Sequence, residues 1–294
     1  MILGSQFRPV HGETGFCRGI VRRFRNRQWP KSAVSGGPQD ASIWGHHPLY
    51  KLRSIVFIVL VVLWTLVLSP AVPILWLANA GATKVRAVAQ VWSNGIVWLF
   101  KYVIGLDYRE QGRENIPDGP CIIACNHQSL WETAVLCAIF PDASIVAKQE
   151  LRKLPIVGWF LHRYPMILVD RAAGRQALRQ MNDEARRAIG EGRKVLIFPQ
   201  GTRQAVGEPT KFQPAGIAAL YTNLDTPVLP VAHNSGLFWG KKTLMIHSGL
   251  ITLSYLPVIP PGLDRKVFQA QLEQVIVAEA DRLAGTAETT KAAS

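Results

Sequence analysis

A histidine and a carboxylate lie close together at the end of an apolar run. The run Cys121–Cys125 has the composition of a buried strand, and His127 and then Glu132 follow it. On one helix these two side chains would point about 140° apart, so they meet only if His127 precedes a helix and Glu132 lies in its first turn. Ser129 and Glu132 have the spacing of a capping box, which predicts a helix beginning at Ser129. The pattern suits a general base oriented by a carboxylate, although each residue alone also fits a structural role.

A second apolar run ends in a turn suited to anion binding. Gly201 permits a tight turn, and Thr202 and Arg203 offer hydrogen-bond donors to a phosphate. Two further cations, Lys148 and Arg171, also follow short apolar runs. Each cation alone fits a solvated charge equally well. Their repeated placement at strand ends predicts a shared pocket for a phosphorylated substrate.

The charge of the chain is unevenly distributed. The formal net charge is +13, and residues 1–53 hold nine lysines or arginines against two acidic residues. Such a segment can bind nucleic acid or an anionic membrane surface. Because it adjoins a long apolar stretch, we expect a membrane and no nucleic acid. The four cysteines show neither CxxC pairs nor zinc-ligand spacing, so we expect a reducing compartment and no metal.

Ser54–Thr83 is a stretch of thirty residues without a formal charge, long enough to span a bilayer. Basic residues flank both of its ends, so a single span would leave one basic cluster on the wrong side. We therefore expect a membrane-embedded helical hairpin that turns at Pro70 and Pro73. Residues 1–50 are expected to form a basic extension without regular structure. The alternatives for the apolar stretch are a single span and a buried core helix.

The remainder of the chain predicts an α/β domain, because apolar runs alternate with helical patterns. Residues 87–106 have the pattern of an amphipathic helix. We therefore divide the chain into the extension (1–50), a membrane-associated helical segment (51–106) and the α/β domain (107–294). The predicted strands are Cys121–Cys125, Ser144–Ala147, Met166–Val169, Val195–Phe198, Val228–Val231 and Ile251–Leu256. The predicted helices of the domain are Leu130–Ile139, Leu154–His162, Gly174–Glu191 and Arg265–Leu283.

Four sequence blocks, in order, resemble those of the glycerolipid acyltransferase family, especially its bacterial 1-acylglycerol-3-phosphate acyltransferases. The likeness covers roughly residues 50–285. The blocks are N-H-x4-D at Asn126, His127 and Glu132, a second at Met166–Arg171, F-P-E-G-T-R at Phe198–Arg203, and an apolar-proline block at Val228–Ala232. Glu132 stands where the family has aspartate, which keeps the carboxylate. Gln200 stands where the family has glutamate, which removes a charge beside Arg203 and loosens whatever that glutamate oriented.

The resemblance implies a mixed sheet flanked by helices, of the glycerol-3-phosphate acyltransferase type, and direct acyl transfer without a metal or cofactor. His127 would deprotonate the acceptor hydroxyl, with Glu132 orienting the imidazole. Arg203, supported by Lys148 and Arg171, would bind the acceptor phosphate. The implied acceptor is 1-acyl-sn-glycerol-3-phosphate, and the product is phosphatidic acid. The donor would be a thioester of acyl carrier protein or of coenzyme A.

The implied location is the inner membrane of a bacterial cell, with the catalytic domain on the cytoplasmic face and membrane lipid as a partner. An acyltransferase acting on another lysolipid, such as lyso-ornithine lipid, is the alternative within the family. A non-catalytic membrane lipid-binding protein is the alternative of another class, but it would have no need of a base and a carboxylate. A serine hydrolase is disfavoured, because the sequence contains no G-x-S-x-G motif.

Overall fold

The computed structural model describes residues 48–153, 158, 164, 166–208, 212–241 and 243–292. These residues all belong to one compact unit, which spans residues 37–294. Nearly all of the predicted N-terminal extension lies outside the described residues. The predicted helix Leu154–His162 does so as well, apart from Gly158.

A seven-stranded sheet forms the centre of the described chain, in the order β1-β7-β6-β2-β5-β3-β4. All neighbouring strands are parallel except β6 and β7, which are antiparallel. Each of the six predicted strands is present. The strands are β1 Leu106–Gln111, β2 Ile122–Cys125, β3 Ser144–Lys148, β4 Ile167–Val169, β5 Val195–Ile197, β6 Val228–His233 and β7 Gly249–Tyr255.

Strand β2 is apolar throughout because both of its faces are buried, which is the usual pattern of a parallel sheet. Ile122 and Ala124 join one hydrophobic cluster, whereas Ile123 and Cys125 join another on the opposite face. The period of two along the strand thus supplies both cores. This burial explains why β2 is recognisable in the sequence as a short uninterrupted apolar run.

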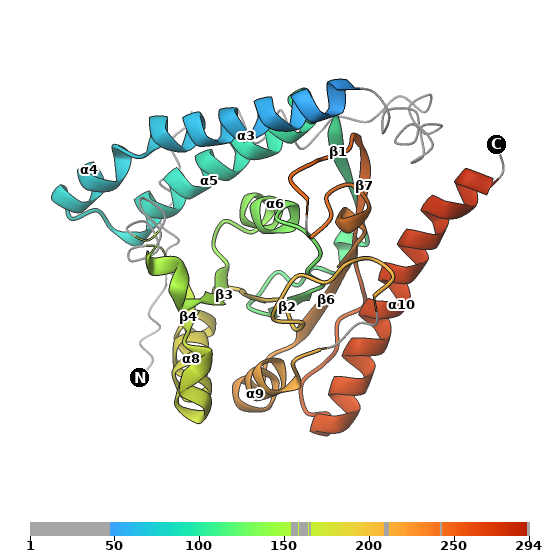
Figure 1. The fold of residues 1–294 in the computed structure, drawn as a ribbon. Coiled ribbons are helices and arrows are strands. Elements are labelled where there is room, and N and C mark those ends of the chain that lie inside the picture. Colours follow the sequence, from blue (N-terminus) through green and yellow to red (C-terminus); the bar gives the residue numbers. More distant parts are fainter. Residues whose placement is uncertain are drawn as a thin grey trace, which may run out of the picture. The chain divides into compact units, whose positions relative to one another are not determined.

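Helices cover both faces of the sheet (Figure 1). Helices α8, α9 and α10 pack on the face that carries Ile122, and α5 and α6 belong to the clusters of the other face. A π-helical turn, Phe100–Ile104, extends α5 towards β1. The bounds are α5 Ala82–Leu99, α6 Trp131–Ile139, α8 Gly174–Gly190, α9 Pro214–Leu224 and α10 Arg265–Ala292.

The apolar segment forms two helices, α3 (Pro48–Leu68) and α4 (Ala71–Leu77). The predicted reversal at the prolines is wrong. Pro70 is the N-cap of α4 and Pro73 lies in its first turn, where a missing N–H breaks no helical hydrogen bond. The chain instead reverses between α4 and α5, at residues 78–81.

Helix α5 then runs back along α3 (Figure 1). The Trp64 indole donates to the Trp92 carbonyl at 3.1 Å, while Phe57 contacts the Phe100 ring with a centroid distance of 4.5 Å. A third anchor lies near the start of α3, where the buried Ser54 hydroxyl accepts a hydrogen bond from the backbone N–H of Ile246 at 2.9 Å. One face of α3 is therefore fixed to α5 and the π-helical turn, and the start of α3 is fixed to the α/β domain.

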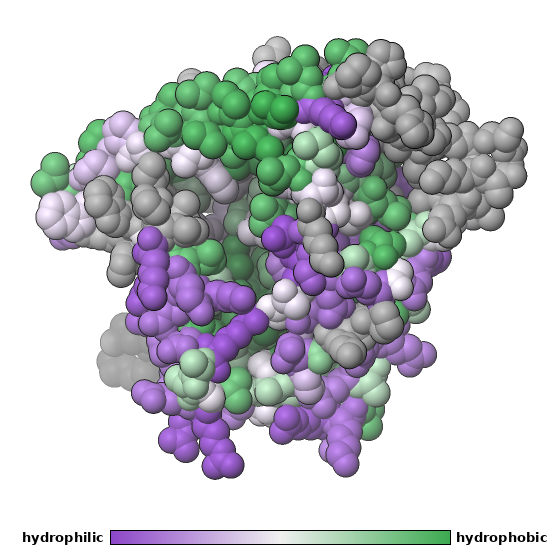
Figure 2. Space-filling model, viewed as in Figure 1, coloured by the Kyte–Doolittle hydropathy of each residue, from purple (hydrophilic) through white to green (hydrophobic). Residues whose placement is uncertain are grey.

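The other face of α3 and much of α4 are exposed. The stretch Leu49–Leu77 is long and apolar enough to cross a membrane, judged by length and composition, and only 6% of its most apolar window is buried. The alternative of a buried core helix is therefore wrong. The exposed apolar side chains gather in a band over these helices (Figure 2). They include Leu52, Ile55, Val59, Val62, Leu63, Leu66, Val67, Ile74, Trp76 and Leu77.

Candidate active site

The candidate site lies at the carboxyl ends of the neighbouring central strands β6, β2 and β5. This is a usual location for ligand sites in α/β proteins. Asn126 links two of these ends. Its amide donates to the His233 carbonyl at 2.9 Å, and its Oδ1 accepts from the His233 N–H at 3.0 Å. The side chain thereby continues the β2–β6 pairing past the last paired residues and holds the two loops together.

The structure brings His127 and Glu132 into contact. The distance between His127 Nδ1 and Glu132 Oε1 is 2.8 Å, with His127 before helix α6 and Glu132 in its first turn. The capping box predicted a helix start at Ser129, but the helix begins at Trp131. The Ser129 hydroxyl accepts from the Trp131 N–H at 3.0 Å, one residue before the usual capping-box partner, and donates its proton to Glu132 Oε2 at 2.6 Å.

The Glu132 carboxylate is fully buried and accepts five hydrogen bonds. Its Oε1 accepts from His127 Nδ1 and from the backbone N–H groups of Gln128 and Ser129, at 2.7 and 2.8 Å. Its Oε2 accepts from the hydroxyls of Ser129 and Ser235, the latter at 3.0 Å. Five hydrogen-bond donors favour the charged form of a carboxylate even where water is excluded.

Two histidines flank this carboxylate. Burial alone would raise the pKa of Glu132, but His233, the His127 ring and the Ser129 hydroxyl outweigh it and lower the pKa to about 2. His233 Nε2 lies 4.0 Å from Glu132 Oε2 and 2.8 Å from the Asn126 carbonyl. Burial lowers the pKa of His233. This ring is therefore neutral near pH 7, with Nε2–H donating to Asn126 and Nδ1 accepting from the Ser235 N–H.

His127 is oriented for proton transfer at its second nitrogen. Because Glu132 is ionised, the hydrogen bond fixes the His127 proton on Nδ1 and leaves a lone pair on Nε2. The imidazole stacks on the Phe198 ring at a centroid distance of 4.3 Å, and 18% of the side chain stays exposed. No hydrogen bond to Nε2 is found among the described residues. A substrate hydroxyl could therefore reach this nitrogen.

The predicted anion ligands follow β3, β4 and β5. Gly201 adopts a positive φ of 66°, and a Cβ atom there would lie 3.3 Å from both terminal guanidinium nitrogens of Arg171. The turn therefore needs glycine, and the segments that follow β4 and β5 meet at this point. Thr202 is exposed and Arg203 is half-buried in the same turn.

Lys148 is exposed at the end of β3, where it pairs in register with Val169 of β4, two residues before Arg171. Within the described part of the chain, Lys148, Arg171 and Arg203 form no ion pair. Their charges are thus available to an anionic ligand.

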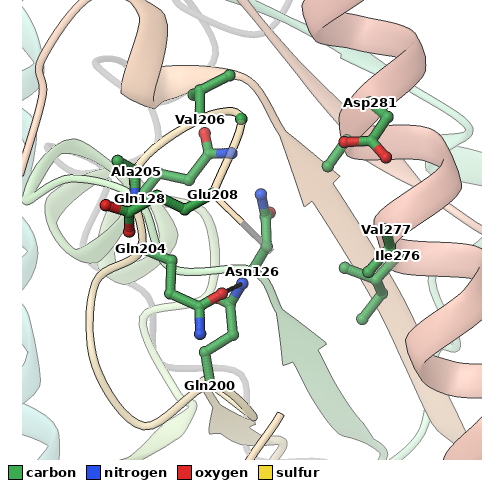
Figure 3. Close-up of a pocket in the computed structure, with 12 residues that line it drawn as sticks. Asn126, Gln128, Gln200, Gln204, Ala205, Val206, Glu208, Ile276, Val277 and Asp281 are labelled. Carbon is green, nitrogen blue, oxygen red and sulfur yellow. Dashed lines mark hydrogen bonds between the residues drawn. The ribbon is translucent and has the colours of Figure 1, made fainter. Parts of the chain in front are cut away.

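A cleft lies beside the candidate site, between the loop after β5 and helix α10 (Figure 3). The His127 ring and the three predicted cations do not line it. Its polar lining consists of amides and two carboxylates, so it does not suit a phosphate. The polar side chains are those of Asn126, Gln128, Gln200, Gln204, Glu208 and Asp281. Among the described residues, no three His, Cys, Asp or Glu side chains are grouped to hold a metal ion.

Sequence reasoning missed the partners that reach the site from the end of β6 and from the loop after β5. His233 and Ser235 surround the far side of Glu132, and Gln204 contacts the backbone of His127. The one signal in the sequence is the polar triplet that follows the apolar residues of β6, His233 to Ser235. Such a triplet at a strand end marks a site only when the neighbouring strands are known.

Comparisons with known proteins identify a family. Residues 107–234 match the acyltransferase family. A 1-acyl-sn-glycerol-3-phosphate acyltransferase of Pseudomonas aeruginosa is 40% identical over 176 residues, which cover 60% of this chain and 68% of that protein. The human 1-acyl-sn-glycerol-3-phosphate acyltransferase beta is 30% identical over 164 residues, covering 55% of this chain and 59% of that protein.

One solved structure shares the fold. The crystal structure of the 1-acyl-sn-glycerophosphate (LPA) acyltransferase PlsC from Thermotoga maritima aligns with a TM-score of 0.66 at 22% identity. The alignment covers 79% of this chain and 95% of that one. The predicted mixed α/β sheet flanked by helices is thereby confirmed.

The depressed pKa of Glu132 predicts how stability depends on pH. Because the folded-state pKa is about 2, against an ordinary value of 4.5, the carboxylate contributes stability above pH 4.5 that is lost as the pH falls towards 2. In Glu132→Gln we expect lower stability at pH 7 and a flatter decline below pH 5, measured by denaturant unfolding across this range.

The matched control is Glu150→Gln, which removes an exposed carboxylate. This variant should keep the wild-type dependence on pH. If the free energy of unfolding of Glu132→Gln fell below pH 5 as steeply as that of the wild type, the assignment of a buried, ionised Glu132 would be contradicted.

Proposed function

The chain belongs to the acyltransferase family, and from that premise we propose that it transfers a fatty acyl group from an acyl thioester to the free hydroxyl of 1-acyl-sn-glycerol-3-phosphate. The product would be phosphatidic acid, a precursor of phospholipids. One observation carries the proposal: the buried Glu132 carboxylate fixes the His127 tautomer and leaves Nε2 free. The names of the Pseudomonas and human relatives support the choice of acceptor.

In the proposed mechanism, His127 acts as a general base. Its Nε2 takes the proton of the acceptor hydroxyl as that oxygen attacks the thioester carbonyl. The tetrahedral intermediate then expels the thiolate, which takes the proton back from the imidazolium. Glu132 stabilises the imidazolium through the 2.8 Å contact with Nδ1. Because Glu132 keeps its charge throughout, it works as an electrostatic partner and not as a proton carrier.

Phosphate binding is assigned to the turn after β5 and the neighbouring cations. Arg203 presents a planar guanidinium that can hold two phosphate oxygens at once. Arg171 lies against Gly201, so its charge adds to the same turn, and Lys148 lies at the end of the adjacent strand β3. Thr202 contributes a hydroxyl donor. This cationic group favours lysophosphatidate over lyso-ornithine lipid, whose headgroup has no phosphate.

We further propose that the exposed face of α3 and α4 attaches the enzyme to one leaflet of a bacterial inner membrane, with the α/β domain in the cytoplasm. An apolar face of this extent matches the acyl chains of a membrane. The contacts of Ser54 with Ile246 and of Phe57 with the Trp239 ring support attachment along the bilayer surface over a crossing, because the start of α3 cannot leave the α/β domain without breaking them. The lipid acceptor would then reach the site from the same leaflet.

The catalytic assignment is tested with purified protein, lysophosphatidate and each thioester donor. Wild-type protein should form phosphatidate, and His127→Ala should abolish the reaction while the protein stays folded. Glu132→Gln should lower kcat by roughly 10²- to 10⁴-fold, because the tautomer and the imidazolium lose their support. Glu132→Asp keeps the charge and should be tolerated far better. Near-normal turnover by His127→Ala would exclude the general-base role.

The phosphate assignment is tested at Arg203. Loss of one partner of a desolvated charge pair costs about 2–5 kcal/mol of binding free energy, which lowers the affinity roughly thirty- to several-thousand-fold. Arg203→Ala should raise the KM for lysophosphatidate strongly, and Arg203→Lys should restore it only in part. Arg179→Ala, on the exposed face of α8, is the control. Unchanged lysophosphatidate saturation combined with weaker donor binding would move Arg203 to the donor site.

The membrane assignment is tested by labelling introduced cysteines in spheroplasts and inverted vesicles, in a background with Cys17→Ser and Cys137→Ala, where the remaining Cys121 and Cys125 are buried. We expect Lys51→Cys and Thr83→Cys, which flank the apolar stretch at exposed positions, to react from the same side as Arg179→Cys on α8. Leu77→Cys should be protected until detergent is added, since lipid would cover it. Reaction of the two flanking positions from opposite faces would show a single span and contradict the one-leaflet attachment.

A further inference from the structure

The glutamine that departs from the family pattern has a defined place in the structure. Gln200 is almost completely buried, with 4% of its surface exposed. Its Oε1 accepts a hydrogen bond from the backbone N–H of His127, and its Nε2 donates to Gln204 Oε1 at 3.1 Å. The two glutamine side chains meet in the cleft beside the candidate site (Figure 3).

The second glutamine completes the contact with His127. The backbone N–H of Gln204 donates to the His127 carbonyl at 2.9 Å. Both peptide groups of His127 are therefore held by the segment that follows β5, which also carries Gly201 and Arg203. The ring of the candidate base and the candidate phosphate turn are thus fixed to each other through the backbone.

Glutamine suits this position for a physical reason. Its amide accepts from His127 and donates to Gln204 at the same time, whereas a carboxylate can only accept. The cleft already contains the carboxylates of Glu208 and Asp281, and the described lining includes no cation. A third carboxylate buried there would have no positive partner and would be costly to ionise.

We propose that Gln200, supported by Gln204, is a positioning residue that fixes the backbone of His127 relative to the phosphate turn. The inference rests on the proposed function and adds a residue that acts through the base without touching the substrate. Loss of this contact should allow the imidazole to move relative to the acceptor. A shift of about 1 Å in a reacting group can lower the rate by as much as about 100-fold.

The test uses the full-length protein in detergent and the variant Gln200→Met, which keeps the volume and removes both hydrogen bonds. We expect kcat to fall roughly tenfold to 100-fold, with the KM values for lysophosphatidate and donor within about twofold of wild type. Gln200→Glu retains the acceptor for the His127 N–H and should recover most of the lost kcat. Gln180→Met, at an exposed position on α8, is the matched control and should behave as wild type.

Two results would overturn the proposal. One is an unchanged kcat in folded Gln200→Met, with folding judged by its melting temperature. The other is a loss expressed wholly in the KM for lysophosphatidate, which would make Gln200 a substrate ligand. If Gln200→Met does not fold, Gln204→Leu serves instead, with a smaller fall in kcat expected, because the backbone contact of Gln204 survives.

A readout independent of turnover separates this proposal from the proposed function. The rate at which diethyl pyrocarbonate modifies His127 is followed by mass spectrometry in wild type and in Gln200→Met. We expect the variant to react several-fold faster, because its imidazole is less restrained. Equal rates would refute the positioning role, whether or not the wild-type protein acylates lysophosphatidate.

Discussion

The burial of one ionised carboxylate constrains the rest of the structure. An unpaired carboxylate as deeply buried as Glu132 would cost several kcal/mol, so the fold must supply donors to both of its oxygens. Those donors come from the β2–α6 junction and, at Ser235, from the segment after β6. The ends of β2 and β6 must therefore be adjacent and in register. The Asn126 bridge to His233 secures that register, and the tautomer of His127 depends on it.

The same junction connects the chemistry to the membrane-facing helices. Trp131 immediately precedes Glu132 in α6, and its ring is buried in a cluster with Phe57 of α3 and Ile96 of α5. Adjacent residues of a helix point about 100° apart, so the first turn of α6 faces the apolar helices with one side chain and the catalytic pair with the next. Docking of α3 thus stabilises the helix turn that carries Glu132. The apolar segment is part of the core that supports the site and is more than an attached anchor.

The sequence predicts those features of this fold that depend on local periodicity. Six strands and the contact between His127 and Glu132 follow from apolar runs and from capping-box spacing. Strand β1 was missed because its sequence is mostly polar and it lies at the edge of the sheet, paired only with β7. The partners Ser235 and His233 were missed because they lie about one hundred residues from Glu132, and only the strand order brings them close. The reversal was misplaced at the prolines because proline is also compatible with a helix start.

The two departures from the family pattern act on one histidine from opposite ends. Glu132 holds the ring of His127 with a charge, and Gln200 holds its backbone with a neutral amide. Only the carboxylate of Glu132 contacts the imidazole, because the Gln200 side chain reaches the peptide N–H of His127 and not its ring. With the charge confined to Glu132, the imidazolium meets its counter-charge at Nδ1, which leaves Nε2 to exchange the proton with the substrate. The neutral side chain at position 200 is therefore compatible with the proposed base, because its contact with the peptide N–H of His127 needs an acceptor oxygen and no charge.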